Sequence, residues 1–173
     1  MDRIRRTERL AAMTQMLINA PNRSLALSTF CETFDTAKSS ASEDLDIIRT
    51  ALKRFHLGTL ETLPGAAGGV RYRPYVEKED AFAAVNALCK RMSAPGRVLP
   101  GALLYIADLV GDPATLERMG EILATEYYDV EPDFVLTMEM QGIPLAMMTA
   151  RALDVPVVIA RRSVKAYEGA AVH

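Results

Sequence analysis

Short hydroxyl side chains gather between two charged residues in the run Lys38-Ser39-Ser40-Ala41-Ser42-Glu43. Serine hydroxyls and a lysine ammonium donate hydrogen bonds to phosphate oxygens or to base edges. The free backbone amides at the beginning of a helix also attract phosphate. If a helix begins here, the run therefore presents a surface suited to a polyanion such as duplex DNA.

A second candidate contact for a polyanion lies about 25 residues further on, in three glycines and an arginine: Gly65, Gly68, Gly69 and Arg71. Glycine lets a backbone approach a sugar-phosphate chain closely, and a guanidinium adds positive charge. Three arginines near the N-terminus provide a basic arm: Arg3, Arg5 and Arg6. An ordinary flexible loop is the alternative interpretation of the glycines, and a purely structural helix cap is the alternative for Ser40 and Glu43.

A third candidate is the loop Glu139-Met140-Gln141-Gly142, which follows an apolar run and precedes a helical pattern. Ligands of open α/β sheets bind at the carboxyl ends of strands, and phosphates favour helix N-termini. Arg161, Arg162 and Lys165 follow the next apolar run and bring positive charge to the same edge. The pattern alone favours an ordinary turn with solvated basic residues.

Because the sequence holds no Walker loop, GxGxxG, HExxH, nucleophile elbow or metal-ligand cluster, no catalytic residue and no metal site are predicted.

Three helices are expected ahead of the glycines. The first begins at a Thr7 cap and buries apolar residues spaced three and four apart, namely Leu10, Met13 and Leu17. A short extended piece at 24–27 precedes a second helix, which Ser28 caps and which carries Phe30, Cys31 and Phe34 on its apolar side. Ser40 and Glu43 form a capping box for the third helix. The core side of that helix is expected to hold Leu45, Ile48, Leu52 and Phe55.

After Gly58 the apolar period changes from about 3.6 residues to two, which predicts strands at 59–63 and 70–73 joined by the glycine-rich tip. Three helices, the last two joined by a tight turn, followed by such a hairpin are typical of a winged helix-turn-helix. In that arrangement the third helix enters a major groove with its first residues at the base edges. We therefore predict a DNA-binding domain at residues 1–74.

Residues 75–173 predict part of an α/β domain. A helix is expected at 77–92, an apolar run at 103–106, and another helix from Asp112-Pro113 whose buried side holds Leu116, Met119, Leu123 and Tyr127. Strands at 134–138 and 155–160 flank a helix at 142–153, which implies a parallel sheet. The fold class expected is thus α/β overall, with an α+β first domain.

Composition and charge narrow the class of protein. The 173 residues are 50% hydrophobic and 24% charged, and no apolar stretch reaches the roughly 18 residues of a membrane span. Cys31 and Cys89 lack CxxC spacing, so a cytoplasmic protein is expected. Residues 1–73 hold 11 Lys and Arg against 8 Asp and Glu, a net +3, and residues 74–173 hold 9 against 14, a net −5. A basic first part agrees with an anionic partner.

Several blocks of the chain resemble the purine operon repressor family of Gram-positive bacteria: 37–45, 63–70, 97–101, 141–144 and 155–159. The resemblance covers nearly the whole chain. It implies a winged-helix domain joined to a domain of the type I phosphoribosyltransferase fold, which senses phosphoribosyl pyrophosphate (PRPP) without catalysis, in a homodimeric repressor of purine biosynthesis genes. By the resemblance, Glu139 to Gly142 match the pyrophosphate loop, and Tyr105 and Asp108 lie near the purine side of the effector pocket.

The sequence departs from that family at the diagnostic PRPP loop, an apolar strand ending in two adjacent acidic residues before a Gly/Thr-rich phosphate cradle. The 173 residues hold no such motif, so we expect a fragment of a longer protein, with the effector site incomplete. Two other functions are weighed beside the repressor. One is a purine phosphoribosyltransferase, and the other is a winged-helix module that binds a protein partner.

Overall fold

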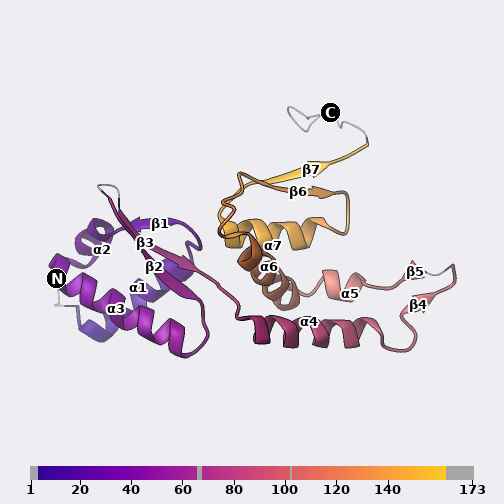
Figure 1. Cartoon of the computed structure of the whole chain (residues 1–173), viewed down its shortest axis with the longest axis horizontal. Helices are drawn as coiled ribbons and strands as arrows, with labels where there is room; N and C mark the ends of the chain where they lie inside the picture. The colour runs from indigo at the N-terminus through magenta and orange to yellow at the C-terminus, as the bar shows by residue number, and fades with distance from the viewer. Residues whose placement is uncertain (1–3, 66–67, 102, 163–173) are drawn as a thin grey trace. The chain divides into compact units, whose positions relative to one another are not determined.

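The computed structural model describes residues 4–65, 68–101 and 103–162, which form two compact units, Met1–Glu77 and Lys78–His173 (Figure 1). Arg3 and Lys165, two of the predicted site residues, lie outside the described residues. Among the helices described, none has the length and apolar character needed to cross a membrane.

The first unit places three helices against a three-stranded antiparallel sheet (Figure 1). Its elements are α1 (Arg6–Ile18), β1 (Ser24–Ala26), α2 (Leu27–Phe34), α3 (Lys38–Arg54), β2 (Thr59–Leu63) and β3 (Gly69–Arg73). The strand order is β1-β3-β2, so the last strand of the unit lies in the middle of the sheet. Leu25 pairs with Val70 on one side of β3, and Leu60 pairs with Tyr72 on the other.

The predicted apolar stripes of the three helices form the core of this unit, with one exception. Met13 and Phe30 are fully buried, and the remaining buried apolar side chains of the helices are Leu17, Phe34, Ala41, Leu45, Ile48 and Leu52. Phe55 was expected in this core but is 63% exposed. The reason is that α3 ends at Arg54, and Phe55 at the C-cap leaves the helical path and lies under the Arg54 guanidinium, 5.6 Å from it.

The predicted caps of all three helices are wrong, because each helix begins one or two residues earlier than its expected capping side chain. Thr7 lies inside α1, which begins at Arg6, and Ser28 lies inside α2, which begins at Leu27. Ser40 is the third residue of α3. Extended backbone at Arg5, Ala26 and Ala37 precedes the three helices, so the approach of the chain, rather than a capping hydroxyl, sets where they start.

In the described residues, the second unit contains a parallel strand pair, four helices and a short antiparallel hairpin (Figure 1). Its elements are α4 (Lys78–Met92), β4 (Val98–Leu99), β5 (Leu103–Leu104), α5 (Ala107–Val110), α6 (Pro113–Tyr127), β6 (Val135–Met138), α7 (Ile143–Leu153) and β7 (Val157–Ala160). β6 and β7 pair in parallel with α7 between them in sequence, which confirms the predicted β-α-β unit.

Helices α6 and α7 pack together through small residues, and this differs from the expected core of α6. The buried positions of α6 are Gly120 and Ala124, and the buried positions of α7 include Ala146 and Ala150. A Cβ at Gly120 would lie 2.7 Å from the backbone carbon of Met148. Of the residues predicted to be buried, Leu123 and Tyr127 are exposed, while Leu116 and Met119 are only partly buried. The close approach of the two backbones selects the small-residue face of α6 for burial.

Candidate nucleic-acid interface and effector site

The first turns of α3 expose the polar residues that the sequence singled out. Lys38, Ser39 and Ser42 are exposed, whereas Ala41 and Leu45 of the same helix are buried in the core. Within the part of the chain that the structure describes, no hydrogen bond or ion pair engages the side chains of Lys38, Ser39 or Ser42. The first backbone amides of a helix have no acceptor within it. Ammonium, hydroxyl and amide donors are therefore all directed outward at this end of α3.

The predicted capping box of α3 does not form. Ser40 lies within the first turn and is partly buried, and the Glu43 carboxylate lies 3.5 Å from the Arg6 guanidinium instead of at a cap amide. Glu43 thus pairs with a residue that the sequence assigned to the same DNA-binding surface. The two charges offset each other.

A hollow of about 240 Å³ separates α3 from the β2–β3 hairpin. Ser42, Asp46 and Arg49 line it from α3, and Thr62, Gly65 and Gly68 line it from the hairpin. Arg49 joins the two sides, because its Nε donates to the Leu60 carbonyl oxygen at 2.9 Å and its Nη2 to the Thr62 hydroxyl at 2.8 Å. The structure therefore brings the helix start and the hairpin, which the sequence predicted separately, onto one surface.

The backbone conformation and the packing of the hairpin account for its glycines without a nucleic-acid contact. Gly65 has a φ of +116°, a conformation that side chains other than glycine rarely adopt. A Cβ at Gly68 would lie 2.4 Å from the Leu63 carbonyl oxygen, and one at Gly69 would lie 2.2 Å from that of Leu25. Gly69 belongs to β3 and is buried, so it permits the close pairing of β1 with β3 rather than lying at the hairpin tip.

Arg71 lies on β3 beside a carboxylate. Glu61 on β2 accepts a hydrogen bond from Arg71 at 3.3 Å and one from Arg73 at 3.0 Å. Only 18% of the Arg71 side chain is exposed. Arg71, which the sequence assigned to phosphate binding, thus holds the two strands of the hairpin together.

Arg6 and Arg9 converge on a buried carboxylate that sequence reasoning missed. Nε of Arg6 donates to Oδ1 of Asp44 at 2.8 Å, and Nε of Arg9 donates to Oδ2 at 2.6 Å. The Asp44 side chain is fully buried. Burial by itself raises the pKa of Asp44, but the hydrogen bonds and charges of Arg9 and Arg6 outweigh it and hold that pKa below its ordinary value. Arg5, in contrast, is exposed, and its backbone N–H donates to Glu8 at 2.8 Å.

The predicted effector loop lies at the carboxyl ends of β6 and β7, as expected of a β-α-β unit. A hollow of about 500 Å³ there is lined by Met138, Glu139, Ala160, Arg161 and Arg162. Nε of Arg161 lies 3.4 Å from Oε1 of Glu139, so the loop and the basic residues after β7 do meet. Met140, Gln141 and Gly142 are exposed.

Gly142 immediately precedes α7 and lies close to the end of β6. A Cβ at this position would lie 2.6 Å from the hydroxyl oxygen of Thr137 on β6. The turn between β6 and α7 is therefore tight, and it directs the first amides of α7 toward the strand ends, where phosphates bind in open α/β sheets.

Tyr105 and Asp108 do not line that hollow. Two nitrogens of Arg97 bind the two carboxylate oxygens of Asp108 at 2.8 and 2.7 Å, and one of them also donates to the Tyr105 carbonyl oxygen at 3.0 Å. The hydrogen bonds from Arg97 hold the pKa of Asp108 below its usual value. This bidentate pair fixes the β4–β5 hairpin to α5.

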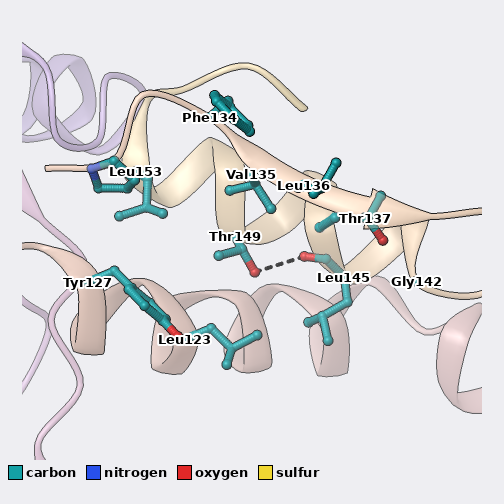
Figure 2. A pocket seen from close by; sticks show the side chains of 12 residues that line it. Leu123, Tyr127, Phe134, Val135, Leu136, Thr137, Gly142, Leu145, Thr149 and Leu153 are labelled. Carbon is teal, nitrogen blue, oxygen red and sulfur yellow. Dashed lines mark hydrogen bonds between the residues drawn. The ribbon is translucent and has the colours of Figure 1, made fainter. Parts of the chain in front are cut away.

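A second cavity, of about 480 Å³, lies between α6, α7 and β6 and was not foreseen from the sequence (Figure 2). The residues that line it include Leu123 and Tyr127 of α6, Val135 of β6 and Leu145 of α7 (Figure 2). The hydroxyl of Thr149 within it donates to the Leu145 carbonyl oxygen at 2.9 Å. The walls are mostly apolar, so this cavity does not suit a phosphate. The apolar spacing of Leu123 and Tyr127 was the only sequence signal for it.

The geometry defines a class of protein first. The order α1-β1-α2-α3-β2-β3, with an exposed polar start of α3 beside a hairpin, is the arrangement that the sequence predicts for a winged helix-turn-helix, and an α/β unit follows it in the chain. Among the described residues, no group of three or more His, Cys, Asp or Glu side chains is placed to hold a metal ion.

Comparison with known proteins shows which proteins the chain is similar to. Residues 5–74 match the family model described as the N-terminal domain of the bacterial purine repressor. The chain is 41% identical over 170 residues to the purine biosynthesis transcriptional repressor PurR of Bacillus subtilis, covering 98% of this chain and 60% of that protein. It is 40% identical over 167 residues to the purine biosynthesis transcriptional activator PurR of Lactococcus lactis, covering 96% of this chain and 62% of that protein. The resemblance to the purine repressor family is thus confirmed.

Enzymes match a smaller part of the chain. The xanthine phosphoribosyltransferase of Deinococcus deserti is 36% identical over 81 residues, which cover 45% of this chain and 42% of the enzyme. That of Geobacillus thermodenitrificans is 35% identical over 78 residues. The chain spans about three fifths of the length of the curated purine regulators that it matches.

Proposed function

We propose that this chain is the DNA-binding part of a transcriptional repressor of purine biosynthesis genes, acting in the cytoplasm as a homodimer and without catalysis. The observation that carries the proposal is the match of residues 5–74 to the purine repressor domain, in which α3 exposes Lys38, Ser39 and Ser42. The proteins similar over nearly the whole chain are named as purine biosynthesis regulators.

In the proposed complex α3 enters the major groove, and Lys38, Ser39 and Ser42 reach phosphates and base edges. The hairpin tip at Gly65 lies against the neighbouring backbone as a wing. Two copies of the chain place two α3 helices on a roughly palindromic site, so that each base contact is made twice. Contacts from lysine and arginine make the affinity depend on salt.

Fluorescence anisotropy tests the proposal with the 173-residue chain, a purine-promoter duplex and a random duplex of equal length, each at several salt concentrations. We expect salt-sensitive binding to both duplexes and tighter binding to the promoter. Absence of DNA binding by the folded chain would favour a winged-helix module for a protein partner. A promoter–reporter assay then decides the sign of regulation, since the relative in Bacillus subtilis is named a repressor and that in Lactococcus lactis an activator.

We also propose PRPP as the effector of the whole regulator, held at its pyrophosphate by Glu139 to Gly142 with Arg161 beside them. The hollow at the ends of β6 and β7 supports this, because it gathers these groups at the edge where phosphates bind in α/β folds. The acidic pair and Gly/Thr-rich cradle of the family do not occur in the sequence. We therefore expect PRPP to leave the DNA affinity of the 173-residue chain unchanged, and a PRPP-induced loss of affinity would show that the loop suffices.

A purine phosphoribosyltransferase is the second candidate, favoured by the partial similarity to xanthine phosphoribosyltransferases. The first unit argues against it, because phosphoribosyl transfer does not need a winged helix. Incubation of the chain with PRPP, Mg²⁺ and xanthine, followed by chromatography for xanthosine monophosphate, separates the two functions. We expect no product, and turnover would establish the enzyme.

A further inference from the structure

Three carboxylates lie in the first half of α3, the helix proposed to enter the groove: Glu43, Asp44 and Asp46. Negative charge there opposes the approach of DNA phosphates. The structure supplies an arginine to each of them. Arg6 lies 3.5 Å from Glu43, Arg6 and Arg9 bind Asp44, and Arg49 binds Asp46. The repulsion expected from the sequence is therefore neutralised within the unit.

Asp44 differs from the other two acids because it faces inward. Its side chain is fully buried, each of its oxygens accepts from a different arginine, and only 13% of the Arg9 side chain is exposed. Both arginines lie in the first turns of α1, 35 and 38 residues before Asp44 in the sequence. Removing one partner of a buried ion pair leaves an uncompensated charge, so this link between α1 and α3 is stiff.

The link is attached at the end of α3 that carries the proposed contacts. Asp44 lies two residues after Ser42 and six after Lys38, and Arg49 fixes the next turns of the same helix to β2. The rotation and tilt of the exposed row of donors are therefore set by α1 on one side and by the hairpin on the other.

We propose that Arg6 and Arg9 are positioning residues for DNA recognition, which act through Asp44 to fix the start of α3 rather than by binding phosphate. The inference rests on the proposed DNA-binding function and deepens it. It assigns to Arg6 a different role from the one expected of a basic arm, and it adds Arg9 and Asp44, which the sequence did not single out.

The two roles of an arginine predict different salt dependences. Loss of a phosphate contact lowers the slope of log affinity against log salt by about 0.9 and weakens binding to all sequences alike. Loss of positioning leaves the slope on random DNA unchanged and reduces the preference for the promoter. In addition, Asp44→Asn removes a negative charge, so it strengthens binding if only charge matters and weakens promoter binding if Asp44 positions α3.

The test compares Arg9→Gln, Asp44→Asn and the double variant by anisotropy on promoter and random duplexes over a range of salt. Arg54→Gln is the matched control, since Arg54 is exposed at the opposite end of α3 and its loss changes the net charge equally. We expect the ratio of promoter affinity to random-duplex affinity to fall about 5- to 30-fold in each single variant. The double variant loses no more than the worse single one, because the two residues act as one unit. Arg9→Lys restores part of the preference, since it keeps the charge.

A lower salt slope for Arg9→Gln, together with tighter binding by Asp44→Asn, would overturn the inference and make Arg9 a phosphate contact. If Asp44→Asn does not fold, Arg6→Gln decides in its place, because Arg6 is half exposed and its loss keeps the Arg9–Asp44 bond. Arg6→Gln is expected to keep the wild-type salt slope on random DNA and to lose promoter preference. Absence of DNA binding by the wild type overturns the proposed function itself, whereas wild-type binding with unchanged variants overturns this inference alone.

Discussion

At the scale of single residues, the formal charges of the first unit have partners that the sequence does not show. Glu61 accepts from Arg71 and Arg73, and Asp44 accepts from Arg6 and Arg9. Four of the arginines that make residues 1–73 basic are thus paired inside the unit. These four arginines are therefore engaged within the unit, and Lys38 gains importance as an exposed cation at the helix start.

The ion pairs of Asp44 make the stability of the first unit depend on pH. Because its pKa is lowered in the folded chain, the stabilisation is present above the unfolded pKa, about 3.9, and is lost as the pH falls through the folded pKa. We expect Asp44→Asn to lower the free energy of unfolding at pH 7 by about 1–3 kcal/mol. The difference from wild type shrinks as the pH falls below about 4, where Asp44 of the unfolded chain takes up a proton, and continues to shrink toward the lower pKa of the folded chain. Urea unfolding followed by circular dichroism at pH 7 and pH 3 measures this, and an equal difference at both pH values would contradict it.

Gly120 gives a residue-scale prediction for the second unit. In an exposed helix, a change from glycine to alanine stabilises by about 1 kcal/mol. Here the added Cβ would lie 2.7 Å from the Met148 backbone, so Gly120→Ala is expected to destabilise by about 1–3 kcal/mol through overpacking. Thermal unfolding followed by circular dichroism gives the sign directly. A higher Tm for the variant would mean that α6 and α7 do not approach this closely in solution.

At the scale of elements, α3 and the hairpin respond differently to loss of a positive charge. Lys38→Ala is expected to leave the unfolding free energy within about 0.5 kcal/mol and to lower the salt slope of DNA binding by about 0.9. Arg71→Ala is expected to lower the Tm, because Arg71 joins β3 to Glu61 on β2. Anisotropy at several salt concentrations and thermal unfolding separate the two effects. An unchanged Tm with a smaller salt slope for Arg71→Ala would restore Arg71 as a phosphate contact.

Periodic elements were predictable from the sequence, whereas their ends were not. The spacing of Met13 with Leu17, and of Leu45 with Ile48 and Leu52, correctly identified the buried faces of α1 and α3. The predicted helix starts were wrong because a serine or threonine close to a helix start fits the capping pattern even when the helix begins before it. The strands β4 and β5, two residues each, were missed, since so short a strand has no measurable period.

The sequence indicates which segments form the candidate sites, but not the contacts between residues that are far apart in the sequence. Lys38 to Ser42 and Glu139 to Gly142 could be proposed from the sequence because hydroxyls, amides and loop position carry a local signal. The contact of Arg9 with Asp44 spans 35 residues. The sequence holds one indication of it, namely that Asp44 adjoins Leu45 on the buried stripe of α3. A charged residue on such a stripe needs a partner, but only the packing of α1 against α3 shows which one.

At the scale of the whole chain, the second unit exposes several large apolar side chains. Val98 is 73% exposed and Leu103 is 65% exposed in the β4–β5 hairpin, and Leu136 and Met138 of β6 are also exposed. Val98 and Leu103 lie on the same short hairpin, and exposed apolar side chains that gather in this way mark association sites. The first unit, in contrast, has a closed core whose buried members come from all three helices and from β2 and β3.

We therefore expect the chain to associate with itself as its concentration rises, in agreement with the proposed homodimer. Sedimentation velocity across a hundredfold range of concentration measures this. The double variant Val98→Ser and Leu103→Ser is expected to shift the distribution toward monomer and to leave the DNA affinity of the first unit for random duplex unchanged. A wild-type chain that sediments as a monomer throughout would contradict the expectation.

The strand order β1-β3-β2 has a consequence for the way the protein is made. β3 is the last strand of the first unit to leave the ribosome, and both β1 and β2 pair only with it. Asn22 also needs β3 for its hydrogen bonds. Its backbone N–H donates to the Tyr72 carbonyl oxygen at 2.6 Å, and its side chain accepts from Arg73 at 3.0 Å. During translation the sheet therefore closes in a single late step, after residue 73 has emerged, and a nascent chain stalled before Gly69 exposes two unpaired strands to chaperones and proteases.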